Sequence, residues 1–201
     1  MKAIQIRLND KLLDKEFKRL SKQLNQLDEK EVPRGVSRVI NREAEKAKTK
    51  VVRRVAKNIG IKQKLVRDRV FRNKARPNRL VSRIWGGQDA INALNAGAKK
   101  TDDGFKLGPY EWQGAFQWNG STGGKPVALY RDPNREERGP LRESNRKTGY
   151  PLLRAEIGQQ FVAKEVREAM DEAGEQALNR DLTPALNKEL TFRLNKTLGK
   201  K

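Results

Sequence analysis

The chain of 201 residues carries 45 basic and 25 acidic residues, a net charge of +20, and only 35% of its residues are hydrophobic. It has no cysteine and no histidine, which excludes disulfides, thiolate zinc sites, histidine-based catalytic triads and histidine acid–base chemistry. A hydrophobic share this low suits one domain that gains part of its stability from partners.

The positive charge is concentrated in the first half of the chain. Residues 1–100 hold 28 basic and 10 acidic residues, whereas residues 101–201 hold 17 and 15. Such a field attracts polyanions, and nucleic acid is the usual one, bound through its phosphates with release of counterions. A solvated cationic face, or one that meets an acidic protein, is the alternative explanation.

Residues 1–31 are expected to form a short strand around Ile4–Leu8 and an amphipathic helix from about Asp10 to Leu27. This segment has no apolar run of signal-peptide length, and no window of the chain approaches the roughly 18 to 20 apolar residues of a membrane span. The chain is therefore expected to stay in a cytosol-like space without contacting a membrane.

Residues 32–77 predict a basic helical hairpin. Apolar residues recur at intervals of three and four from Pro33 to Asn58, Gly60 fits a left-handed cap, and Lys62–Asn73 is expected to be a further helix with Leu65, Val66 and Val70 inward. The other faces carry ten basic residues that we expect to meet DNA or a partner protein: Arg38, Arg42, Lys46, Lys50, Arg53, Arg54, Lys57, Lys62, Lys64 and Arg67.

Residues 78–155 predict the strand-rich part. Alternation favours strands at Arg79–Trp85 and Ala90–Leu94, and Ala115–Trp118 is expected to pair with Val127–Arg131 across a loop at Asn119–Lys125. Residues 132–149 are polar and rich in turn formers, which indicates an exposed loop. Large aromatic residues are expected in the core or at a subunit interface: Trp112, Phe116 and Trp118.

Residues 156–201 predict two helices. The apolar face of the first helix consists of Phe161, Val162, Val166, Met170, Ala173 and Ala177. Thr183 and Pro184 are expected to be the N-cap and the first position of the second helix. Leucines at 178, 182, 186, 190, 194 and 198 are more typical of core than of a partner-binding stripe. The fold class is α+β, with a small antiparallel sheet flanked by long amphipathic helices.

The stretch VVRRVAKNIGIKQKLVRDRVF also fits a helix-turn-helix. Ala56, Gly60 and Val66 have the required spacing, and the side chains of Lys62, Gln63, Lys64 and Arg67 would face base edges. The preceding helix is longer than this motif normally uses. Gly120–Lys125 lacks the spacing of a phosphate-binding loop, and no carboxylates are placed for acid–base or metal chemistry. We therefore expect no enzyme, cofactor or metal.

Several segments resemble the minor tail protein Z family of long-tailed phages and prophages. They are PRGVSRVINREAEKAKTKVVRRVAK, KLVRDRV, GAFQWNG, PVALYRD and YPLLRAEIGQQF, and the resemblance runs from about Val32 to Lys196. The polar loop at 132–149 is longer than the family pattern.

The resemblance implies a non-enzymatic virion protein with a fold similar to tail-completion and tail-terminator proteins. It implies a ring, six-fold like the tail tube, that completes the tail in the phage neck beside the tail terminator, supports head–tail joining and lets genomic DNA pass without sequence readout. Assembly would take place in the host cytoplasm. The charge leaves two other classes open: a DNA-binding regulator or nucleoid protein, and an RNA-binding protein.

Overall fold

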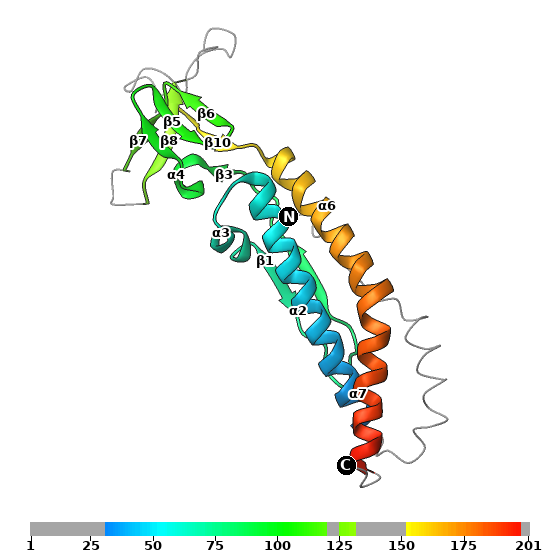
Figure 1. Ribbon diagram of the computed structural model, residues 1–201. Coiled ribbons are helices and arrows are strands. Elements are labelled where there is room, and N and C mark those ends of the chain that lie inside the picture. The colour runs from blue at the N-terminus through cyan, green and yellow to red at the C-terminus, as the bar shows by residue number, and fades with distance from the viewer. Residues whose placement is uncertain (1–30, 120–124, 132–151, 198–201) are drawn as a thin grey trace.

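The computed structural model describes residues 31–119, 125–131 and 152–197. The molecule is elongated, with long helices forming a rod and most strands gathered at one end of it (Figure 1). The expected N-terminal strand and helix, the exposed loop at 132–149 and residues 120–124 of the expected loop at Asn119–Lys125 lie outside the described residues.

Helix α2 (Glu31–Ile59) confirms the long amphipathic helix expected at Pro33–Asn58. The residues predicted to face inward are buried: Val36, Val39, Ile40, Ala44, Ala47, Val51, Val55 and Ile59. The helix closes at Gly60, whose φ of +76° places it in the left-handed region that only glycine adopts readily. The amides of Gly60 and Ile61 both donate to the Ala56 carbonyl, at 3.0 Å each, which caps the helix as predicted.

The helix expected at Lys62–Asn73 is wrong in its second half. Helix α3 covers only Gln63–Arg67, and the chain then enters strand β1 (Val70–Asn73), which pairs antiparallel with β2 (Arg83–Gly86). A two-residue turn between Arg76 and Arg79 closes this hairpin, with hydrogen bonds of 2.9 and 2.8 Å in the two directions. A strand alternates its side chains, so Val70 and Ile84 enter the core while Phe71 and Trp85 face away from it.

The hairpin is joined to α2 by the side chains of Asn41 and Arg72. Asn41 donates from Nδ2 to the Ala75 carbonyl at 2.9 Å, and its Oδ1 accepts from the Ala75 amide at 2.8 Å. Arg72 adds a hydrogen bond to the Asn41 carbonyl and an ion pair with Glu45 at 2.9 Å. These bonds join residues more than 30 positions apart, so the local sequence pattern does not reveal them. They favour the strand at Val70–Asn73 over the predicted helix.

The predicted strands of the middle region are confirmed in part. Only Arg83 to Trp85 of the expected strand at Arg79–Trp85 belongs to β2, and Ala90–Leu94 splits into β3 (Ile91–Asn92) and a short helix α4 (Ala93–Ala96). Asn92 causes the change, because its side chain accepts from the Leu94 amide at 3.2 Å and caps α4. Strand β3 pairs with β10 (Glu156–Ile157).

Two three-stranded antiparallel sheets form the strand-rich end. Strand β7 (Phe116–Trp118) pairs with β8 (Val127–Arg131), which confirms the predicted pair, and β9 (Leu152–Arg154) adds to the other edge of β8. The second sheet has the order β4 (Lys99–Thr101), β5 (Gly104–Leu107) and β6 (Tyr110–Gln113), and was not predicted. Phe116 and Trp118 are exposed by 38% and 48%, so they do not belong to the core of this chain.

The C-terminal helices are continuous where a break was predicted. Helix α6 (Gln159–Gln176) passes through a π-helical turn η2 (Ala177–Asp181) into α7 (Leu182–Thr197). Thr183 and Pro184 lie inside α7, so the expected cap there is wrong. Proline removes an amide and crowds the carbonyl four residues earlier, and the wider π turn immediately before it lets the helix continue.

Helices α2, α6 and α7 build the core of the rod. The second half of α2 packs on α6 and on the β1–β2 hairpin, whereas its first half packs on α7. Leu182, Leu186 and Leu190 are buried, which supports core packing for the leucine series. Phe161 was expected inward but is 39% exposed and meets Tyr110 edge-on. The architecture is therefore α+β, with small antiparallel sheets; a tail-terminator-like fold stays a prediction.

Candidate basic interface along helix α2

The ten basic residues singled out from the sequence follow one face of α2 and continue past its end. Seven of them lie on α2, from Arg38 to Lys57, while Lys62 precedes α3 and Lys64 and Arg67 belong to it. All ten are exposed or half-buried. Spacings of three and four residues align the α2 members into a stripe, because side chains at those intervals share a helix face.

Four of these cations are paired with carboxylates. Lys46 Nζ and Arg42 Nε lie 2.9 and 3.4 Å from Glu43 Oε1. Lys50 Nζ lies 3.4 Å from Asp181 Oδ2 in η2, and Arg54 pairs with Glu172 on α6. Lys50 and Arg54 thus join α2 to the C-terminal helices, and their charge is compensated within the chain.

The other six basic residues have no ion pair with any residue in the described ranges. Five of them cluster around the turn from α2 to α3: Arg53, Lys57, Lys62, Lys64 and Arg67. Arg38 stands alone nearer the start of the helix. The uncompensated positive charge is therefore concentrated at the α2–α3 turn, not spread along the whole stripe.

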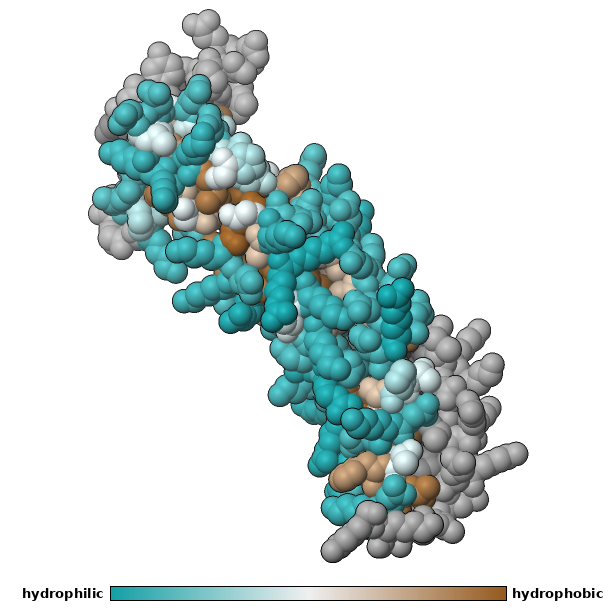
Figure 2. Space-filling view, viewed as in Figure 1, coloured by the Kyte–Doolittle hydropathy of each residue, from teal (hydrophilic) through white to brown (hydrophobic). Residues whose placement is uncertain are grey.

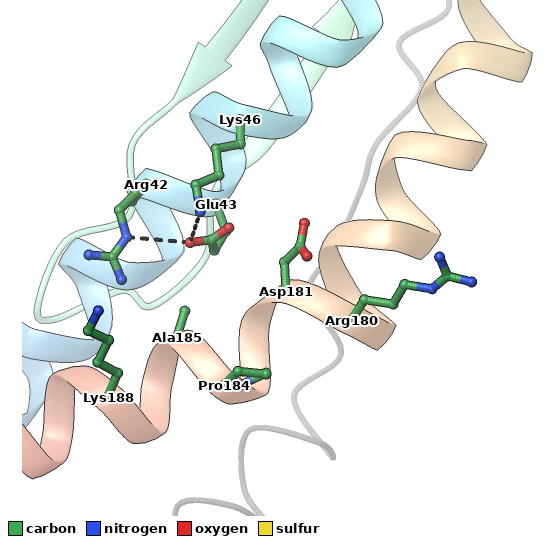
Figure 3. A pocket seen from close by; sticks show the side chains of 8 residues that line it. All are labelled: Arg42, Glu43, Lys46, Arg180, Asp181, Pro184, Ala185 and Lys188. Atoms are coloured by element: carbon green, nitrogen blue, oxygen red, sulfur yellow. Dashed lines mark hydrogen bonds and ion pairs between the residues drawn. The ribbon is translucent and has the colours of Figure 1, made fainter.

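A groove of about 470 Å³ lies between α2 and the start of α7. It is lined by Arg42, Glu43, Lys46, Arg180, Asp181, Pro184, Ala185 and Lys188. Figure 3 shows Glu43 directed toward the η2–α7 segment between Arg42 and Lys46, while Arg180 extends away from it. Glu43 is 2% exposed, and its Oε2 has no hydrogen-bond partner among the described residues.

Sequence reasoning missed the carboxylates that compensate the stripe. Glu43 reads as a polar helix residue, and its only local signal is the three-residue spacing to Lys46. Asp181 and Glu172 lie more than 100 residues away from their partners, so only the packing of α6 and α7 on α2 reveals them. The separation of compensated from uncompensated cations is information that the structure adds.

The described residues contain no arrangement suited to metal binding, and none of their helices is long and apolar enough to cross a membrane. The helix-turn-helix interpretation lacks its second helix, because α3 has only five residues and leads into a strand. A helix of that length places too few side chains along a DNA groove for base recognition. Across the face seen in Figure 2, the rod is mostly hydrophilic.

A family model described as prophage minor tail protein Z (GPZ) matches residues 15–199. The chain belongs to this family. Membership in the minor tail protein Z family makes it a structural protein of the phage tail, located in the virion. Comparisons with curated proteins and with solved structures find no significant match. Exposed surfaces are therefore the candidate sites of this minor tail protein Z, and five of the predicted cations without an ion pair to any described residue cluster at the α2–α3 turn.

Proposed function

We propose that this minor tail protein Z completes the tail as a ring component of the phage neck, supports joining of the tail to the DNA-filled head, and lies beside the DNA that passes through. The observation that carries the proposal is the uncompensated cation cluster at the α2–α3 turn, on a family member with a net charge of +20. A channel for DNA requires cations that slide over phosphates, and exposed lysines and arginines without fixed partners meet that requirement.

The compensated cations have a different role in this proposal. Lys50 and Arg54 pair with carboxylates on η2 and α6, so their charge is compensated within the chain while the cations at the α2–α3 turn remain available. Subunits are proposed to form a closed ring, six-fold to match a tail tube, in contact with the tail terminator. The aromatic pair Phe116 and Trp118, exposed on β7, suits contacts with neighbouring proteins, since interfaces are enriched in such residues.

The proposal is tested with a phage lacking this gene and complemented by the wild-type chain. Without complementation, we expect filled heads and tails of normal length that do not yield infectious joined particles. Gold-labelled antibody against the complementing chain should mark the head-proximal end of the tail. Label along the whole tail, or normal infectious particles without the chain, would contradict the proposal. A footprint at one defined operator would instead support the alternative, a DNA-binding regulator.

A further inference from the structure

The outward face of the β1–β2 hairpin combines exposed aromatic side chains with cations. Because Phe71 pairs with Trp85 and Asn73 with Arg83 across the two strands, these four side chains share the face that points away from the core. Phe71 is 57% exposed and Trp85 is half-buried. Packing does not require an exposed phenylalanine beside a tryptophan, since Val70 and Ile84 already supply the hairpin's core side.

The hairpin also carries charged residues of one sign only. Residues Val70–Gly86 contain five basic residues and no acidic residue. Among the described residues, Arg72 is the one of the five that forms an ion pair, with Glu45, and it points to the core side. Lys74, Arg76 and Arg79 are exposed at the hairpin tip without an ion pair to any residue in the described part of the chain. These three cations extend the positive surface of the α2–α3 turn along a second element.

Arg83 adds a further cation to the outward face of the hairpin. It lies on the outward face opposite Asn73, and its Nε is shielded from solvent without a hydrogen-bond partner among the described residues. Because Nε is shielded, a phosphate at this face would have to bind the rest of the Arg83 guanidinium group. Arginine beside an aromatic surface suits a phosphate next to an apolar sugar edge.

We infer that the β1–β2 hairpin is a contact element for the backbone of double-stranded DNA. Lys74, Arg76, Arg79 and Arg83 bind phosphates, while Phe71 and Trp85 lie against the apolar edges of the sugars. A two-stranded ribbon has the width to follow a DNA groove. The same hairpin of a second copy is a poor occupant, because its segment Val70–Gly86 would bring five more basic residues and no acidic residue to this face. The inference rests on the proposed function for the identity of the polyanion, the phage's own duplex.

The first test measures binding of the purified chain to a fluorescent 30-base-pair duplex of arbitrary sequence as salt is varied. The triple variant Lys74→Gln, Arg76→Gln, Arg79→Gln should bind more weakly and lower the slope of log K against log salt by about 2 to 3, since each lost phosphate contact removes about 0.9. The matched control is Lys164→Gln, Arg167→Gln, Lys188→Gln, which removes three exposed charges from α6 and α7. Equal effects of the two triple variants would overturn the inference.

The second test examines the aromatic face in a Trp112→Phe, Trp118→Phe background, where Trp85 is the remaining tryptophan of the three. Its emission should change on addition of the duplex, and Phe71→Ser should weaken binding about fivefold through loss of apolar contact. An unchanged emission signal, or a neutral Phe71→Ser, would overturn the inference. Much tighter binding of a single strand would overturn the assignment to duplex DNA.

A third arm uses poly-glutamate as competitor at equal charge concentration. Poly-glutamate should displace the duplex poorly, because it offers no sugar edge to Phe71 and Trp85. Equally effective displacement would assign the hairpin to acidic proteins instead of DNA. All three measurements use the isolated chain, so they can contradict DNA binding by the hairpin even when the gene deletion gives the expected tail phenotype. The tail phenotype can likewise fail while DNA binding by the hairpin holds.

Discussion

At the scale of single residues, a close contact between α2 and α7 explains why a glycine occupies position 35. Gly35 lies near the N-terminal end of α2, at a helical position where glycine is intrinsically less favourable than alanine. A Cβ atom at that position would lie 2.6 Å from Nε and 2.9 Å from Cδ of Arg193 on α7. Arg193 is buried, and it binds the Glu31 carbonyl at 3.2 Å, the Glu31 carboxylate and Glu189 at 3.0 Å. Glycine at 35 is therefore needed for the arginine to cross α2.

Gly35→Ala is expected to lower the free energy of unfolding by about 1 kcal/mol, because displacing Arg193 from two carboxylates outweighs the gain of about 1 kcal/mol in helix propensity. In an Arg193→Ala background, the same change should raise stability by about 0.5 to 1 kcal/mol. Urea denaturation of the four proteins in a double-mutant cycle measures both signs. Stabilisation by Gly35→Ala in the otherwise unmodified chain would show that Arg193 moves aside freely.

Glu31 should make the same contact pH-dependent. The hydrogen bond from Arg34 and the positive charges of Arg193 and Arg34 lower the pKa of Glu31 below its ordinary 4.5, against the smaller opposing effect of desolvation. A depressed pKa in the folded state contributes stability above the unfolded pKa, and that contribution disappears as pH falls through the folded value. Glu31→Gln should therefore lower Tm at pH 7, and the difference from wild type should shrink progressively below pH 4.5. A Tm difference that is constant from pH 7 to pH 3 would rule out this linkage.

At the scale of elements, periodicity in the sequence predicted what local patterns can determine. The inward face of α2 and the β7–β8 pair are confirmed, because apolar spacing and alternation reflect burial directly. The β1–β2 hairpin was missed because the leucine and valines of Lys62–Asn73 also fit a helix, and the bonds from Asn41 that hold Ala75 are 34 residues distant. The sequence did not predict that the helix continues from α6 through Pro184, because the π turn η2 that makes room for the proline has no sequence signal.

The same division applies to the candidate surface. Sequence spacing placed the ten cations away from the apolar face of the predicted helical hairpin, and in the structure they are exposed or half-buried. The sequence could not show that Arg54 is ion-paired while its neighbour Arg53 is not, because the partner Glu172 lies more than a hundred residues later in the chain. The cations at Lys74, Arg76 and Arg79 were not selected at all, because an expected helix followed by a strand gave no reason to group them on one hairpin.

The inward face of α2 gives a direct test of the element's packing. Val55 is 1% exposed in the core between α2, α6 and the hairpin. Val55→Asp should cost about 3 to 5 kcal/mol or prevent folding, because an unpaired carboxylate would be buried there. The matched control is Arg53→Asp, two residues earlier on the exposed face, which should cost less than about 1 kcal/mol. Denaturation midpoints and yields of soluble protein compare the two, and similar losses would place Val55 outside the core.

At the scale of the whole molecule, the basic residues fall into two groups, those paired with carboxylates and those exposed without an ion pair among the described residues, and only the fold shows which residue belongs to which group. Glu43 compensates Arg42 and Lys46 within α2, whereas Asp181 on η2 and Glu172 on α6 pair with Lys50 and Arg54 between elements of the rod. The cations at the α2–α3 turn and at the hairpin tip contribute to the surface instead. A tail protein that meets DNA needs both kinds, since the rod must stay rigid while the surface stays free to slide along phosphates.

This separation predicts different consequences for two sets of variants of equal charge. Replacing Arg53, Lys57, Lys62 and Lys64 with Gln should leave the fold intact, because exposed unpaired cations contribute little to stability. The control replaces Lys99, Lys100, Lys164 and Arg167, which are equally exposed but lie on β4 and α6. Circular dichroism melts should agree with wild type within a few degrees for both proteins.

In phage complemented with these variants, the two sets should diverge. The variant of the α2–α3 turn should still allow tails to be built, but head joining or DNA delivery should fail in most particles, because only the cationic surface toward DNA or an acidic neighbour has been lost. The control variant should give near-normal titres, since general reduction of net charge is the same in both. Plaque counts and electron micrographs of joined particles measure the outcome. If both variants infect normally, the α2–α3 cluster is a solvated face, and the proposed contact with DNA must be placed elsewhere on the chain.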